Sequence, residues 1–164
     1  MRPRPIPPGP GQESVWDYPR PPRLERTQRR IEVWLGGVKI VDTMGAYRVL
    51  ETSHPPGFYL PRADFASGVL SPAPGSSVCE FKGRASYWTL SAGGRVAQAA
   101  AWSYEHPTPA FAPITGYLAL YAGRVDRCAV DGEAVTPQPG DFYGGWITGE
   151  VVGPFKGEPG TLGW

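Results

Sequence analysis

Residues 77–104 read SVCEFKGRASYWTLSAGGRVAQAAAWSY, and this stretch decides the fold. Two runs that favour strands, residues 85–90 and 95–104, flank the glycine pair Gly93-Gly94. A two-residue turn of this kind closes a β-hairpin, because glycine adopts the backbone angles that such a turn requires. The stretch also carries a thiol, an amine and several aromatic rings. We therefore expect a central hairpin that supplies many of the candidate functional residues.

Further hairpins are expected on both sides of this stretch. Residues 31–35 and 38–41 flank Gly36-Gly37, and residues 127–130 and 133–135 flank Asp131-Gly132. Additional strands are expected at residues 47–52, 58–60 and 114–121. A short helix is expected at residues 64–70, one helical turn at 24–30, a loop at 71–77, and an ordered but irregular wrap from residue 137 onward.

Composition favours one domain of short strands. The chain has 164 residues, with 22 glycines and 20 prolines, which are unfavourable inside helices. The fold class predicted is mainly β, a single compact domain of antiparallel sheets with at most one or two short helices. Residues 1–14, rich in proline and arginine, are expected to form a flexible arm, and residues 15–164 the domain. Trp16 and Tyr18 are expected to bury their rings against it.

Charge and motif content exclude several functional classes. The net charge of +1 gives no general attraction to nucleic acid, and no apolar run is long enough to span a membrane. The first residues lack the apolar core of a secretion signal, so a cytoplasmic location with reduced thiols is expected. Two isolated cysteines and two histidines predict no metal site, and the absence of nucleotide-binding motifs predicts no cofactor. The oligomeric state stays open.

Two pairs of residues carry the candidate chemistry. Cys79 and Lys82 are three positions apart, where a loop meets a strand, so their side chains can converge on one opening. A desolvated lysine loses basicity, and a nearby ammonium favours a thiolate. Glu51 and His54 can act as a base and the group that orients it. His106, which follows Glu105, is the alternative imidazole.

Aromatic residues complete the candidate site. Tyr87, Trp102 and Tyr104 can stack on a planar ligand or surround a cation. Alternation along a strand places Tyr87 and Trp88 on opposite faces, so only one of them faces a given pocket. The alternative for each ring is core packing, and for Cys79 and Lys82 a buried thiol and a solvated amine.

Several segments resemble a bacterial family called domain of unknown function 427. The most specific is CEFKGRASYW at residues 79–88. The others are VWDYPRPPRLE (15–25), VLETSHPP (49–56), AWSY (101–104), VDGEAVTPQPGDFYGGWIT (130–148) and GPFKGEPGTLGW (153–164). The resemblance implies antiparallel sheets that meet like the sides of a tent. The family is sometimes labelled nucleotidyltransferase-like, but Gly75-Ser76 is followed by no Asp-x-Asp pair here, so that chemistry lacks its metal ligands.

The leading hypothesis is a binding domain for a small molecule, held between the sheets. The expected ligand-binding residues are Glu51, His54, Cys79, Lys82, Tyr87, Trp102 and Tyr104. The first alternative is an enzyme that uses Lys82 or Cys79 as a nucleophile in the same pocket. The second is a structural or partner-binding module whose contact is the N-terminal arm.

Overall fold

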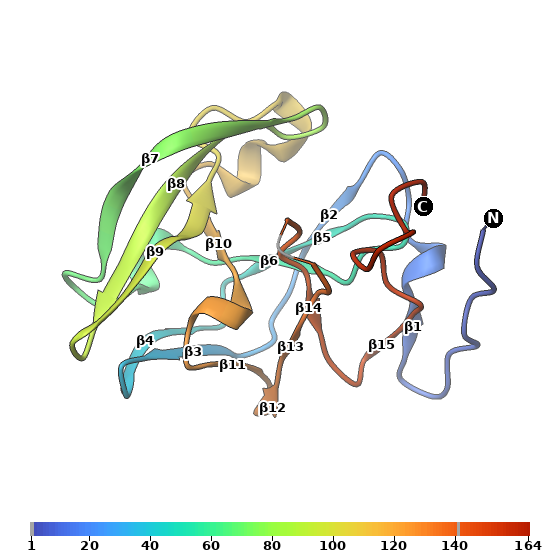
Figure 1. Cartoon of the computed structure of the whole chain (residues 1–164), viewed down its shortest axis with the longest axis horizontal. Coiled ribbons are helices and arrows are strands. Elements are labelled where there is room, and N and C mark those ends of the chain that lie inside the picture. The colour runs from blue at the N-terminus through green and yellow to red at the C-terminus, as the bar shows by residue number, and fades with distance from the viewer. Residues whose placement is uncertain (1, 141) are drawn as a thin grey trace.

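The computed structural model describes residues 2–140 and 142–164, and these residues form five sheets that are antiparallel with one exception (Figure 1). The strands are β1 (Glu13–Ser14), β2 (Arg23–Arg26), β3 (Ile31–Leu35), β4 (Val38–Thr43), β5 (Tyr47–Leu50), β6 (Gly57–Tyr59), β7 (Leu70–Cys79), β8 (Gly83–Ala92), β9 (Arg95–Ser103), β10 (Leu118–Leu120), β11 (Arg127–Val130), β12 (Glu133–Ala134), β13 (Thr136–Pro137), β14 (Trp146–Ile147) and β15 (Val151–Val152). The mainly β class and the three hairpins predicted at glycine turns are confirmed.

One four-stranded sheet has the order β12-β11-β3-β4. Its central strand β3 alternates between buried and half-buried residues, with Ile31, Val33 and Leu35 pointing inward. Glu32 and Trp34 therefore lie on the outer face, as the two-residue period of a strand requires. Burying these branched side chains on one face fixes the register of the sheet.

The second four-stranded sheet has the order β10-β9-β8-β7. Its edge strand β7 covers residues that we expected to form a loop, so that prediction was wrong. The strand tolerates Pro72 and Pro74 because it lies at the sheet edge, where an N–H on the free side has no partner strand to bond. Its pairing with β8 shifts register between Pro72 and Ser76, and Gly75 lies in that interval with a φ of 95°.

The two four-stranded sheets meet at their hairpin turns and lean apart from there, which gives the tent-like arrangement (Figure 1). The contact joins Gly36, in the β3–β4 turn, to Gly93, in the β8–β9 turn. A Cβ atom on Gly36 would lie 2.1 Å from the carbonyl oxygen of Ala92. A Cβ atom on Gly93 would lie 1.9 Å from the carbonyl oxygen of Gly36. No side chain larger than hydrogen fits at this ridge, so the glycines set how closely the sheets approach.

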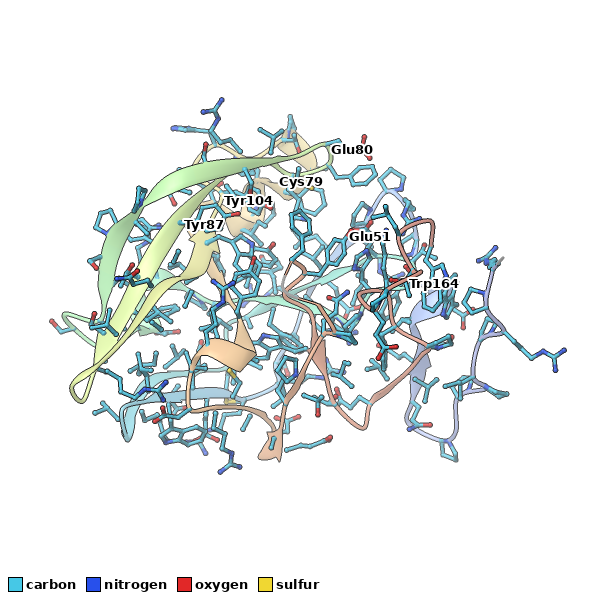
Figure 2. All side chains as sticks on the ribbon, viewed as in Figure 1. Glu51, Cys79, Glu80, Tyr87, Tyr104 and Trp164 are labelled. Atoms are coloured by element: carbon cyan, nitrogen blue, oxygen red, sulfur yellow. The ribbon has the colours of Figure 1, made fainter. Side chains whose placement is uncertain are left out.

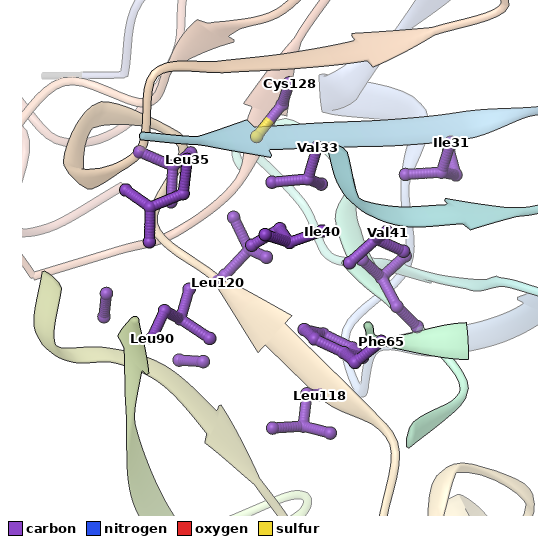
Figure 3. Close-up of a cluster of buried hydrophobic side chains, with 14 of the residues drawn as sticks. Ile31, Val33, Leu35, Ile40, Val41, Phe65, Leu90, Leu118, Leu120 and Cys128 are labelled. Carbon is purple, nitrogen blue, oxygen red and sulfur yellow. The ribbon is translucent and has the colours of Figure 1, made fainter. Parts of the chain in front are cut away.

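The main core fills the space between these sheets. Ile40 and Val41 of β4 join the inward residues of β3, and they face Leu90 of β8 and Leu118 and Leu120 of β10 (Figure 3). All five of these side chains are buried. Removing this apolar surface from water supplies the main driving force that holds the two sheets together.

The third sheet, β2-β5-β6, links the tent to the chain termini. Trp16 and Tyr18 are buried against Leu50 and Val151, so the prediction that their rings pack against the domain is confirmed. Residues 2–12, placed in the flexible arm, run along the C-terminal segment, and the Ile6 N–H donates to the Gly153 carbonyl (2.9 Å). Within the stretch assigned to the arm, β1 pairs in parallel with β15. The mobility of the arm stays a prediction.

Helical structure is limited to short 3₁₀ turns, of which the described ranges contain four. They are η1 (Val15–Asp17), η2 (Arg62–Asp64), η3 (Pro109–Ile114) and η4 (Ala122–Arg124). The helix expected at residues 64–70 was wrong, because Phe65 pairs with Val41 and Gly68 turns the chain at a φ of 78°. The turn expected at 24–30 was also wrong, since β2 pairs there with β5. None of the described helices has the length and apolar character needed to cross a membrane.

Candidate functional site

A cavity of about 340 Å³ lies between the β7–β9 face, strand β6 and the C-terminal segment. All the residues predicted for the site line it: Glu51, His54, Cys79, Lys82, Tyr87, Trp102 and Tyr104. Figure 2 shows Cys79, Tyr87 and Tyr104 beneath the β7–β8 hairpin, with Glu51 opposite them beside the C-terminal segment. Residues far apart in sequence thus converge on one hollow.

The β8–β9 pairing places the aromatic side chains. Tyr87 lies directly opposite Trp102 in the register, so both side chains point to the same face, the cavity side. Trp88 points to the other face, where its indole N–H donates to the Ser103 hydroxyl (2.9 Å). Tyr87 also forms a 2.8 Å hydrogen bond with the Ser77 hydroxyl of β7. The alternation predicted for Tyr87 and Trp88 is therefore observed.

Further rings hold Trp102 in place. Its indole N–H donates to the hydroxyl of Tyr59 (3.3 Å), and its ring centroid lies 4.7 Å from that of Tyr121. Tyr104 is buried, 6.2 Å from Tyr59 between ring centroids, and burial raises the pKa of its hydroxyl above the ordinary value. The Tyr104 phenol is therefore neutral at physiological pH, and its ring lines the cavity together with those of Tyr59 and Tyr121.

The turn between β7 and β8 brings Lys82 to the cavity beside Cys79. Gly83 permits this turn with a φ of 111°, and the Thr108 N–H donates to the Lys82 carbonyl (3.0 Å). Burial by itself lowers the pKa of Lys82, but the neighbouring Tyr59, Cys79 and Glu51 outweigh burial and raise it. The Lys82 amine is therefore an ammonium at neutral pH. The loss of basicity expected for a nucleophilic lysine does not occur.

Glu51 and His54 lie on the turn that follows β5. A Glu51 carboxylate oxygen is 3.4 Å from Arg20 and 3.7 Å from the His54 Nε2. Burial, with the charges of Lys156, Arg20 and Lys82, lowers the pKa of His54 to about 3. His54 is therefore neutral at physiological pH. The alternative imidazole, His106, is exposed and lies outside the cavity lining.

The C-terminal segment supplies a wall that the sequence reading left unassigned. Gln138 is buried, and both Tyr143 and Lys156 line the cavity. The tyrosine ring packs edge-on against His54 with 4.7 Å between centroids. Gly144 allows this wall to approach Trp102, because a Cβ there would lie 2.2 Å from the indole ring. The feature of the sequence that could have indicated this wall was the pair Gly144-Gly145 within an aromatic stretch, because glycines allow close approach to a ring.

The cavity is suited to binding through rings and hydrogen-bond donors. Within residues 2–140 and 142–164, no cluster of three or more histidine, cysteine or acidic side chains is placed to hold a metal ion. The donors that reach the cavity come from lysine ammonium groups, tyrosine hydroxyls and an imidazole, and the one free thiol among its lining residues is Cys79.

Comparison with known proteins identifies the family but no characterised relative. No curated protein matches the sequence. The sequence model of a family described as a domain of unknown function, DUF427, matches residues 23–131, about two thirds of the chain. These residues include most of the strands and many of the residues around the cavity. The chain therefore belongs to the domain of unknown function 427 family.

Proposed function

We propose that this protein binds a small molecule in the aromatic cavity between its sheets. The observation that carries the proposal is that Tyr87 and Trp102 turn only half-buried rings toward a hollow of about 340 Å³. Large rings that only stabilise a fold are usually packed on all sides, as Trp146 is in the main core of this protein. The hollow has the size of small-molecule sites, which run from about 300 to 1,000 Å³.

The arrangement of polar groups supports the same proposal. Small-molecule sites combine apolar walls with a few fixed polar groups that set the orientation of the ligand. Here the walls are aromatic, and the Tyr87 hydroxyl and the Trp102 indole are each held by a hydrogen bond within the protein. A site with fixed side chains loses little conformational entropy when the ligand binds.

A thermal-shift screen against a metabolite library tests the proposal. A ligand that binds only the folded state raises the melting temperature, and the shift grows with ligand concentration. We expect the shift in the wild type to be lost in Trp102→Ala. The matched control is Trp34→Ala, which removes an indole from the outer face of β3 and should retain the shift. A shift that survives Trp102→Ala would contradict binding in this cavity.

A second candidate is catalysis by the Cys79 thiol, favoured by one observation. Cys79 is free, half-buried and close enough to Lys82 to influence the lysine pKa. An adjacent ammonium stabilises a thiolate, which is the reactive form. Iodoacetamide at neutral pH should then alkylate Cys79 in the native protein, and Lys82→Met should slow the reaction. Cys128, which is buried, is the internal control and should react only after unfolding. Equal reaction rates in wild type and Lys82→Met would exclude this role for the pair.

A further inference from the structure

We propose that the cavity selects a ligand with an anionic group, a carboxylate or a phosphate, attached to a planar ring. The inference rests on the proposed binding function and adds the chemical class of the ligand. Lys82 and Lys156 supply the positive charge, and His54 supplies a neutral N–H donor. The aromatic walls accept the ring, while these three groups bind the anion.

Gln138 fixes which ring nitrogen of His54 carries the proton. The side-chain oxygen of Gln138 accepts from the Gly145 N–H (3.0 Å), and its nitrogen donates to the Lys156 carbonyl (2.8 Å). The Gly145 N–H can only donate and the Lys156 carbonyl can only accept, so the side-chain amide of Gln138 has a single orientation. The Gln138 nitrogen also lies 3.0 Å from the His54 Nδ1. Nδ1 is therefore the acceptor, and the proton of the neutral ring is on Nε2.

This tautomer makes His54 a donor rather than a base. The lone pair on Nδ1 is occupied by Gln138, and Nε2 carries its hydrogen on the side of the ring that faces Glu51. A neutral imidazole with this arrangement donates one hydrogen bond and abstracts no proton. The role of general base considered for His54 is therefore replaced by recognition of a hydrogen-bond acceptor.

Two ammonium groups border the same cavity. Within the described residues, no aspartate or glutamate side chain lies within 4.0 Å of the Lys82 or Lys156 amine. The Lys82 Nζ lies 5.9 Å from the ring centroid of Tyr104, and the Lys156 Nζ lies 5.5 Å from that of Tyr143. The Lys156 Nζ also donates to a main-chain oxygen of Trp164, the last residue of the sequence (3.4 Å), which leaves other ammonium hydrogens to be satisfied. Both lysines line the same cavity as His54, and the charges of both lower its pKa.

The acidic groups that line the cavity do not cancel this charge. Glu51 lies 3.4 Å from Arg20, and its side chain is 22% exposed, so an arginine already balances it. Glu80 is exposed at the outer end of β7, where solvent screens its charge (Figure 2). An incoming anion therefore meets more cationic and donor groups than unbalanced carboxylates.

Four ligands that share one ring and differ in the attached group test the inference. We would measure binding of 2-naphthoate, 2-naphthyl phosphate, 2-naphthamide and 2-naphthylmethylamine by calorimetry at pH 7. We expect at least one anion to bind tenfold or more tightly than the amide, and the cationic amine to bind most weakly. The stronger of the two anions identifies the carboxylate or the phosphate as the preferred group.

Lys82→Gln provides the specific variant. Hydrogen bonds to charged groups contribute enough that losing one weakens binding by about ten- to a hundredfold. We expect that loss for the preferred anion and little change for the amide. Lys39→Gln, which removes the same charge on the far side of β3–β4, should leave both affinities unchanged.

The outcomes separate this inference from the proposed function. If the amide or the amine binds as tightly as the anions, and Trp102→Ala abolishes that binding, the cavity binds small molecules but does not select anions. If none of the four ligands binds, the anion inference is overturned, and the metabolite screen alone decides the proposed function. Equal losses in Lys82→Gln and Lys39→Gln would also overturn it.

Discussion

The ridge contact between the Gly36 and Gly93 turns predicts a sharp difference between two neighbouring glycines. Gly93 and Gly94 both have left-handed backbone angles, with φ values of 57° and 79°. A Cβ on Gly93 would lie 1.9 Å from the Gly36 carbonyl oxygen, whereas a Cβ on Gly94 has nothing within 4 Å. Alanine at either position therefore loses stability because of the left-handed backbone angle, but only Gly93→Ala also forces the sheets apart.

The sizes of these two effects can be compared. A left-handed conformation costs a residue with a Cβ about 1–2 kcal/mol, and this should be the whole effect of Gly94→Ala. Overpacking adds about 1–3 kcal/mol, so Gly93→Ala should lose about 2–5 kcal/mol in total. That loss is a large part of the stability of a typical domain, which is about 5–15 kcal/mol. The double variant Gly36→Ala with Gly93→Ala should lose less than the sum, because one displacement relieves both clashes.

Urea unfolding followed by tryptophan fluorescence gives the free energy of unfolding of each variant. The protein contains six tryptophans, and the fully buried Trp146 makes the signal sensitive to core packing. Equal destabilisation of Gly93→Ala and Gly94→Ala would show that no steric clash limits the ridge at Gly93. Simple addition of the losses from Gly36→Ala and Gly93→Ala would show that the two turns do not share one contact.

Three further predictions concern buried polar groups. Nitrogen NMR of the neutral His54 ring should show hydrogen on Nε2 and none on Nδ1, and the opposite tautomer would remove the argument for a donor. Burial lowers the pKa of His54 from 6.5 to about 3, so between pH 6.5 and pH 3 the unfolded chain binds more protons than the folded one. The free energy of unfolding should therefore fall as the pH drops from 6.5 toward 3. His54→Gln should reduce this slope in pH-dependent urea unfolding, and an unchanged slope would contradict the assignment. The Arg48 side chain is 2% exposed and ion-paired to Glu13 and Glu25, so Arg48→Ala should lower the free energy of unfolding by about 3 kcal/mol, measured by urea unfolding. Arg23→Ala, which removes one partner of an exposed ion pair, should lower it by less than about 1 kcal/mol. Similar losses in the two variants would contradict the role of burial.

Local turn chemistry explains why much of the fold could be predicted. Gly36-Gly37, Gly93-Gly94 and Asp131-Gly132 each close a hairpin because their backbone angles suit the turn, and this information lies within a few residues. The errors came where tertiary contacts override local preference. Strand β7 contains two prolines and a glycine yet pairs along β8, because an edge strand has one free side.

The candidate site was predictable on one side of the cavity only. Tyr87 and Trp102 lie on one hairpin, and alternation along its strands fixes the face of each side chain, although a register shift between Trp88 and Leu90 is what sets them directly opposite each other. Gln138 and Lys156 reach the cavity through irregular backbone, whose path depends on contacts such as Gly144 against Trp102. No periodicity in the sequence encodes that path.

The placement of Gly144 limits how the C-terminal wall of the cavity can vary. The β3–β4 and β8–β9 hairpins lie within residues 23–131, whereas the wall that carries Gln138, Tyr143 and Lys156 comes from a separate, later stretch. At Gly144 a side chain would meet Trp102 of β9, but substitutions at Gln138, Tyr143 and Lys156 lie outside the β3–β4 and β8–β9 strands. Proteins built on the same tent would then share one scaffold and differ in the chemistry of this cavity wall.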